Sequence, residues 1–273
     1  MIVRIVIFIL FLLEVFNITT YVFYRIKGKG RATLVIRKKS AKGGKMTYCI
    51  PGLKADVKET FKFLEQLTLQ KPNLMPGGLT YIRYNNYGFD PEQIAKQIIR
   101  DIKRFEYEPY IISLSIGDQI ARIVEAEIEG LKIIAINPIP NADCIRFDTL
   151  FVLQVKLAFL NFLTSFIGWF GELKLIRTNG QARQSISLYL DCLNCQAESN
   201  LEVTTEATKG LIISRYDKLL DNKEVVLNFP YLTTNQVERV DTWHANTVIG
   251  NVLYAEKMEK LLPNFYPPKE EDA

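Results

Sequence analysis

Apolar, strand-like runs alternate with helix-like segments along most of the chain, and this alternation constrains the fold more than any other feature. Up to residue 138 the strand-like runs are ATLVIRK, KMTYCI, LTYIRYN, YIISLS and LKIIAINP, and the pattern resumes after residue 206 with KGLIISRYD and NQVERVDTW. Strands that are almost continuously apolar and separated by helices are typical of a mainly parallel sheet that helices cover on both faces. The sequence therefore predicts an α/β fold.

Local signals refine this expectation at two places. The clearest helix is DPEQIAKQIIRDIKRF, because Asp90 suits the N-cap, Pro91 the first helical position and Gln93 the third. The first two strands flank the turn-like residues 39–44, KSAKGG. This arrangement predicts that they pair as a hairpin.

A helical insertion interrupts the alternation at residues 139–205. Its stretch TLFVLQVKLAFLNFLTSFIGWF has Lys156 as its only charged residue. Such an insertion between two strands of one sheet is typical of a cap or lid. Two interpretations of its apolar surface stay open: an acyl-binding or membrane-facing lid, and a helical hairpin that fills its own small core.

The N-terminal segment is the second unusually apolar part of the chain. Residues 2–24 contain only Arg4 and Glu14 as ionisable groups, and residues 25–45 hold nine basic side chains and no acid. A helix of about twenty residues spans the roughly 30 Å of a bilayer core, and a basic flank stays on the cytoplasmic side. We therefore expect a single-pass anchor with the following domain in the cytoplasm. A signal-peptide core, or a hydrophobic helix packed on its own domain, are the alternatives.

These observations predict four parts: an anchor at 1–24, the first part of an α/β core at 25–138, a helical cap at 139–205, and the second part of the core at 206–273.

Charge and cysteine content exclude several classes of function. The chain is +4 overall, but the basic segment 25–45 supplies all of this excess, so residues 46–273 are net acidic and do not suit nucleic acid. Cys192 and Cys195 have CxxC spacing, yet the chain has one histidine and no second CxxC. A zinc site would therefore lack ligands. Phosphate-binding glycine motifs are missing as well, and we expect neither a metal nor a cofactor.

The segment Ser113-Leu114-Ser115-Ile116-Gly117 lies between a predicted strand and a predicted helix. A serine in this context, with small residues two before and two after, resembles the nucleophile elbow of the α/β-hydrolase family. The resemblance covers about residues 32–265. It implies an α/β-hydrolase fold and Ser115 as the nucleophile.

The same resemblance implies the other site residues. His244, the sole histidine, follows the last predicted strand, where the family keeps its catalytic base. Asp217 follows the strand KGLIIS and matches the family's acid; Asp221 is the fallback, and Asp241 is too close to His244 in sequence.

Backbone N–H groups of Ile116 and Leu53 are the expected oxyanion hole. The family commonly has His-Gly before the second donor, whereas this chain has Pro51-Gly52. The glycine is kept, but the side-chain bracing that the histidine gives is lost.

The function expected from these residues is a serine hydrolase that cleaves a carboxylic ester through an acyl-enzyme. The apolar insertion and the N-terminal segment favour an apolar acyl or lipid-like substrate, while the leaving group stays open between alcohol, thiol and amine. The alternative is a catalytically weak or inactive, membrane-tethered binding or scaffold protein of the same fold.

Overall fold

The protein is described here by a computed structural model. It describes residues 8, 11, 12, 15, 33–36, 44–52, 60–75, 77–83, 90–146, 206–244 and 247–266. The cap expected at 139–205 lies outside these residues from position 147 onward, as do Leu53, Cys192 and Cys195, so the predicted division into four parts stays a prediction.

The described residues form a seven-stranded sheet in the order β1-β3-β2-β4-β5-β6-β7, in which β1 is antiparallel to β3 and all other neighbours are parallel. The strands are β1 (Thr33–Ile36), β2 (Lys45–Ile50), β3 (Gly78–Arg83), β4 (Glu108–Leu114), β5 (Lys132–Ile136), β6 (Thr208–Ser214) and β7 (Val237–Val240). The predicted mainly parallel sheet is therefore confirmed.

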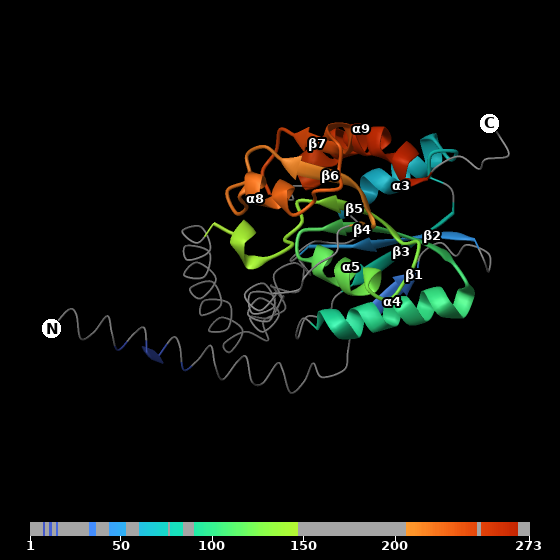
Figure 1. Cartoon of the computed structure of the whole chain (residues 1–273), viewed down its shortest axis with the longest axis horizontal. Helices are drawn as coiled ribbons and strands as arrows, with labels where there is room; N and C mark the ends of the chain where they lie inside the picture. Colours follow the sequence, from blue (N-terminus) through green and yellow to red (C-terminus); the bar gives the residue numbers. More distant parts are fainter. Residues whose placement is uncertain are drawn as a thin grey trace, which may run out of the picture.

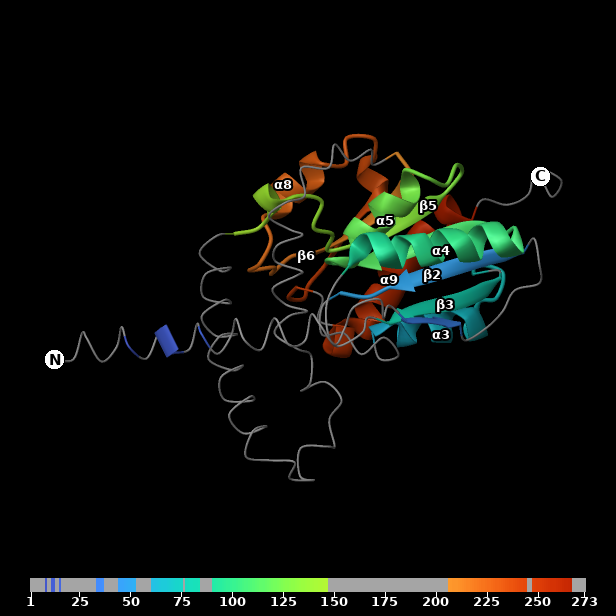
Figure 2. The same cartoon turned by 90° about the horizontal axis from the view of Figure 1, so that it is seen from below.

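Helices cover both faces of this sheet, with α4 and α5 on one side and α3 and α9 on the other (Figure 1, Figure 2). The helices are α3 (Lys62–Gln70), α4 (Pro91–Phe105), α5 (Gly117–Glu125), α8 (Asn222–Leu227) and α9 (Thr247–Phe265), with short 3₁₀ turns η1 (Ala142–Cys144) and η4 (Thr234–Gln236). Helix α4 begins as predicted, since the Asp90 side chain accepts a hydrogen bond from Gln93 N–H at 2.9 Å.

Successive strand residues point to opposite faces of the sheet and therefore pack into two separate hydrophobic cores. In β4, Ile111 packs with α4 and α5, whereas its neighbours Tyr110 and Ile112 pack with α3 and α9. A third cluster, which includes Leu211 and Ile213 of β6, packs against α8. Burial on both faces explains why the strands read as continuous apolar runs rather than as alternating ones.

The expected hairpin between the first two strands is wrong. Strand β3 lies between β1 and β2, and β1 pairs with β3. The eight residues of the link 37–44 can extend about 26 Å, whereas two strand spacings measure only about 10 Å. The link is therefore long enough to pass over one strand, and the turn-like sequence did not fix the pairing.

The expected membrane anchor is also wrong. Among the residues that the structure describes, no helix has the length and apolar character needed to cross a bilayer. Residues Ile5–Leu13 are the longest uninterrupted apolar run of the segment, and nine residues make about 14 Å of helix, half of a bilayer core. Glu14 ends that run. The N-terminal hydrophobic helix, the single-pass topology, the membrane contact and the cytoplasmic placement of the following domain, which all depended on this anchor, are therefore unsupported.

Candidate active site

Ser115 lies at the junction of β4 and α5 in a backbone conformation that is rare for a residue other than glycine. Its φ is 53°, and the residue is 6% exposed. Left-handed conformations cost a non-glycine residue about 1–2 kcal/mol, so the surroundings must hold it in place. They do so through the Ser115 N–H, which donates to Ile136 O at 2.9 Å, and through the Ser115 carbonyl, which accepts from Asp118 N–H at 3.0 Å.

The small residues around Ser115 are required by close backbone approach. A Cβ on Gly117 would lie 2.7 Å from Ile50 O and 2.8 Å from Pro51 O, distances at which backbone would have to move. A Cβ on Gly52 would lie 3.1 Å from the Cβ of Ser115. The turn after β2 and the start of α5 therefore pack directly on each other, as the small-x-Ser-x-small pattern predicts.

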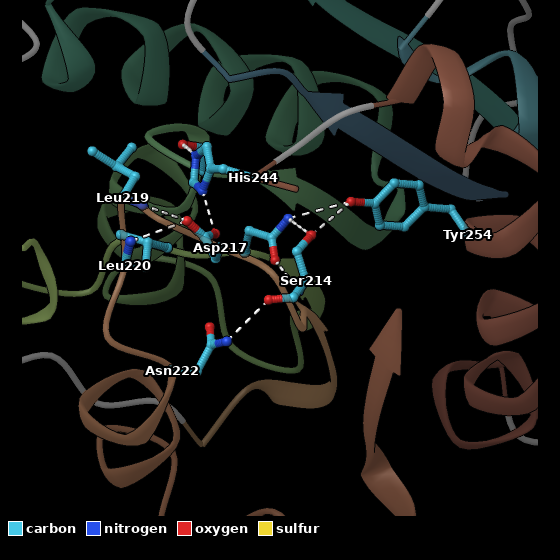
Figure 3. A network of polar contacts seen from close by, with 9 residues as sticks. Ser214, Asp217, Leu219, Leu220, Asn222, His244 and Tyr254 are labelled. Carbon is cyan, nitrogen blue, oxygen red and sulfur yellow. Dashed lines mark hydrogen bonds and ion pairs between the residues drawn. The ribbon is translucent and has the colours of Figure 1, made fainter. Parts of the chain in front are cut away.

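His244 and Asp217 meet Ser115 at the carboxyl ends of three parallel strands. Ser115 Oγ lies 2.8 Å from His244 Nε2, and His244 Nδ1 lies 2.6 Å from Asp217 Oδ2. The Asp217 side chain is fully buried, and the imidazole is 20% exposed. Figure 3 shows the His244 ring facing the Asp217 carboxylate. Ser115, Asp217 and His244 follow β4, β6 and β7, respectively, so the register of the sheet brings them together.

The Asp217 carboxylate is oriented by the backbone that follows it. Its Oδ1 accepts hydrogen bonds from Leu219 N–H at 2.8 Å and Leu220 N–H at 3.0 Å, which leaves Oδ2 for His244 (Figure 3). The two other carboxylates considered from sequence are engaged elsewhere. Asp221 caps α8 by accepting from Lys223 N–H, and Asp241 pairs with Arg215 at 3.0 Å.

Of the two expected oxyanion-hole donors, only Ile116 lies within the described residues. Ile116 is the N-cap residue of α5, and among the described residues no backbone hydrogen bond outside helices and strands uses its N–H as donor. Leu53 lies outside the described residues, although Pro51 and Gly52 before it are buried beside Ser115. The Ile116 N–H thus stays a candidate, and Leu53 stays a prediction from sequence.

Comparison with known proteins gives matches in structure and none in sequence. No protein-family model matches the chain, and no curated protein matches it at a significant level. Among solved structures, a marine microorganism esterase matches with a TM-score of 0.61 and 14% identity, over 85% of this chain and 100% of that one. A carboxylesterase structure from the thaumarchaeon Nitrososphaera gargenis matches with a TM-score of 0.58 and 12% identity, over 86% of this chain and 96% of that one. The chain has the α/β-hydrolase fold. A monoacylglycerol lipase structure from Paleococcus ferrophilus also matches, with a TM-score of 0.54 and 13% identity, over 86% of this chain and 100% of that one.

Identities this low establish the α/β-hydrolase fold alone, so the predicted fold is confirmed and the chemistry depends on the residues of the site.

For metal chemistry, the described part of the chain contains no group of three or more His, Cys, Asp or Glu side chains that can hold an ion. Cys49 and Cys144 are buried as free thiols, and burial raises the pKa of both, that of Cys144 to about 11. Buried neutral thiols of this kind act as packing residues.

A buried ion cluster on α5, the helix that follows Ser115, was missed by sequence reasoning. Arg122 Nη2 lies 2.7 Å from Asp118 Oδ1, and its Nη1 lies 2.7 Å from Glu125 Oε2. Asp118 Oδ1 also accepts from Ser113 Oγ at 3.1 Å, and Glu125 Oε1 accepts from Ala207 N–H at 2.9 Å. The cluster therefore joins β4, the strand that leads to Ser115, to the residue just before β6.

Burial governs the electrostatics of this cluster. It lowers the pKa of the Arg122 guanidinium, but the carboxylates of Asp118 and Glu125 more than offset this effect, so the pKa lies above its ordinary value. Burial raises the pKa of Glu125, although Arg122 and the Ala207 N–H act in the opposite direction. The spacing of Asp118, Arg122 and Glu125 on one helix was a visible signal, while their burial was not.

Proposed function

We propose that this chain is a serine hydrolase that cleaves carboxylic esters, with Ser115 as nucleophile, His244 as general base and acid, and Asp217 as the residue that orients the imidazole. The observation that carries the proposal is the continuous chain of hydrogen bonds from Ser115 Oγ to His244 Nε2 and from His244 Nδ1 to Asp217 Oδ2, at 2.8 and 2.6 Å. A serine hydroxyl becomes an effective nucleophile when a base so placed removes its proton.

The reaction would proceed in two halves. In the first, Ser115 Oγ bonds to the ester carbonyl carbon while His244 Nε2 takes the hydroxyl proton, and collapse of the tetrahedral intermediate breaks the bond to the alcohol, which leaves with that proton. In the second, His244 Nε2 takes a proton from a water molecule as the water oxygen bonds to the acyl carbon. Collapse of this intermediate breaks the bond to Ser115 Oγ, which takes the proton back from His244, and the carboxylic acid is released. The Ile116 N–H, with Leu53 N–H as the expected partner, would bind the negative oxygen.

A fluorophosphonate probe tests this assignment directly, because it bonds covalently to an activated serine. We expect the parent chain to take one label, on the peptide that contains Ser115, and Ser115→Ala and His244→Ala to take none. Ser113→Ala is the matched control and is expected to keep the label, since the Ser113 hydroxyl is fully buried and bonds to Asp118. An unlabelled parent that hydrolyses no ester would instead favour the alternative from sequence, a binding or scaffold protein.

We further propose that the preferred esters carry an apolar acyl chain. Two aromatic side chains adjoin the triad in sequence and are exposed: Tyr216 by 55% and Trp243 by 66%. The turns that carry them are joined by a hydrogen bond from Tyr216 N–H to Thr242 O at 3.1 Å. Exposed aromatic surface on the two turns that carry Asp217 and His244 suits an apolar substrate better than a polar one.

Esters of graded chain length test the apolar preference. With p-nitrophenyl acetate, butyrate, octanoate and laurate, we expect kcat/KM to rise by about fivefold or more from acetate to octanoate, since each buried methylene contributes roughly 0.8 kcal/mol, or about fourfold, and partial burial of the longer chain is enough to reach this factor. Trp243→Ala should reduce the octanoate rate more than the acetate rate. A kcat/KM that falls steadily from acetate to laurate would contradict the apolar preference and leave the triad assignment intact.

A further inference from the structure

Asn137 occupies an unusual position between the strands that carry the candidate triad. It follows β5, the strand between β4 and β6, and has a left-handed φ of 43° while its side chain is fully buried. Asparagine is one of the few residues that tolerates this conformation. Its peptide link is held from both sides, because Ile136 O accepts the Ser115 N–H and Asn137 N–H donates to Ile212 O at 2.8 Å.

The Asn137 amide then bonds to the strand that precedes Asp217 and to the helix that follows His244. Its Oδ1 accepts Ser214 N–H at 2.6 Å, and its Nδ2 donates to Ser214 Oγ at 2.8 Å and to Tyr254 OH at 3.3 Å. The Ser214 and Tyr254 hydroxyls lie 3.1 Å apart, so Asn137, Ser214 and Tyr254 form a closed hydrogen-bond network. Ser214 ends β6, and Tyr254 belongs to α9, the helix that follows His244.

Ser214 connects this network to the Asp217 turn. Its carbonyl accepts Asp217 N–H at 3.3 Å and Asn222 Nδ2 at 2.9 Å (Figure 3). The turn that holds the Asp217 carboxylate is therefore fixed at its first residue by Asn137 from one side and by Asn222 from the other. In Figure 3, Tyr254 points toward Ser214 from the side opposite Asn222.

We propose that Asn137 and Tyr254 are positioning residues of the site, which set the distance between Ser115 and the Asp217–His244 pair by tying β5, the Asp217 turn and α9 together. The inference rests on the proposed function. Its physical basis is that displacement of a catalytic group by about 1 Å can cost on the order of 100-fold in rate. Hydrogen bonds shielded from water are strong and directional enough to prevent such a displacement.

The protonation state of Tyr254 supports this role. Burial raises the pKa of the Tyr254 phenol, and the hydrogen bonds from Ser214 and Asn137 counteract only part of that increase. The phenol is therefore neutral at ordinary pH and keeps its proton for the network. Removal of the hydroxyl leaves the Asn137 amide with a buried N–H that lacks its partner, which favours rearrangement of the amide.

Two substitutions separate positioning from mere stability. Tyr254→Phe removes one hydroxyl at nearly constant volume, and Asn137→Gly keeps the left-handed backbone while removing the amide. We expect kcat for ester hydrolysis to fall about tenfold in Tyr254→Phe and about 100-fold in Asn137→Gly, with KM changed by less than about threefold. Tyr48→Phe is the matched control: it also loses a buried hydroxyl, which bonds to Asp101 on the other face of the sheet, and it should keep the parental kcat.

The single histidine supplies a readout that needs no catalysis. If one ring carbon of histidine is isotopically labelled, His244 gives the single imidazole signal in the NMR spectrum. We expect the chemical shift of this signal to change in Tyr254→Phe and Asn137→Gly but not in Tyr48→Phe. Parental kcat and an unmoved signal in Tyr254→Phe would overturn the inference, even if Asn137→Gly did not fold. A parent chain that takes no fluorophosphonate label would overturn the proposed function instead, while the imidazole signal would still decide whether Asn137 and Tyr254 position His244.

Discussion

Replacing Asp217 by asparagine is expected to lower kcat for ester hydrolysis by about 10⁴-fold, with little change in KM or in folding. The reason is the hydrogen bonding of the carboxylate. Oδ1 accepts from both Leu219 and Leu220 N–H groups, so the single acceptor oxygen of asparagine must take that place. The NH₂ group then faces His244 Nδ1. Nδ1 has to accept, the ring proton moves to Nε2, and Nε2 can no longer take the proton of Ser115.

Two other carboxylates make matched controls for this substitution. Asp221→Asn keeps a good helix cap at α8, and Asp241→Asn removes only an exposed ion pair with Arg215. Both variants should hydrolyse esters at the parental rate, and steady-state kinetics with the preferred ester would measure all three. If Asp217→Asn kept more than about a tenth of the parental kcat, the orienting role of Asp217 would be refuted.

The meeting of Ser115, Asp217 and His244 could be anticipated from sequence because each follows a strand, and parallel strands gather their carboxyl ends at one edge. Local sequence was sufficient there: the small residues around Ser115, the single histidine, and an acid directly after β6. The catalytic role of these residues stays a prediction. The order of β1, β2 and β3 could not be anticipated, since the turn-like link 37–44 allows either pairing.

The roles of Asn137 and Arg122 could not be predicted from sequence for a different reason. Asn137 reads as the polar end of a strand, and its partners Ser214 and Tyr254 lie 77 and 117 residues further along the chain. Arg122 reads as an ordinary helix-surface charge, because spacing shows its pairing with Asp118 but not its burial. Which side chains become buried depends on how distant elements pack, and local patterns carry little of that information.

The Arg122 cluster leads to the largest expected effect on stability. Arg122→Met would leave the Asp118 and Glu125 carboxylates in the protein interior without their cation. Breaking a buried ion pair in this way typically costs about 3–5 kcal/mol, and we expect the free energy of unfolding to fall by that amount at pH 8. Urea denaturation followed by circular dichroism would measure it.

Two companion variants distinguish buried charge from simple loss of contacts. The triple variant Asp118→Asn, Arg122→Met, Glu125→Gln removes all three charges together and should recover about half of the lost stability or more. Lys96→Met breaks an exposed pair with Glu92 on α4 and should change stability by less than about 0.5 kcal/mol.

The pH dependence of the Arg122→Met deficit follows from the same charges. Burial already raises the pKa of Glu125 in the parent chain, and loss of the guanidinium removes the main interaction that opposes this rise. A carboxyl whose pKa is higher in the folded than in the unfolded state favours folding most below its unfolded value, near 4.3, and loses that contribution as pH rises. The stability deficit of Arg122→Met should therefore shrink as pH is lowered from 8 toward 5. A deficit that is equal at both pH values, or that stays below about 1 kcal/mol at pH 8, would mean that the interior of this fold does not depend on Arg122 to neutralise its buried carboxylates.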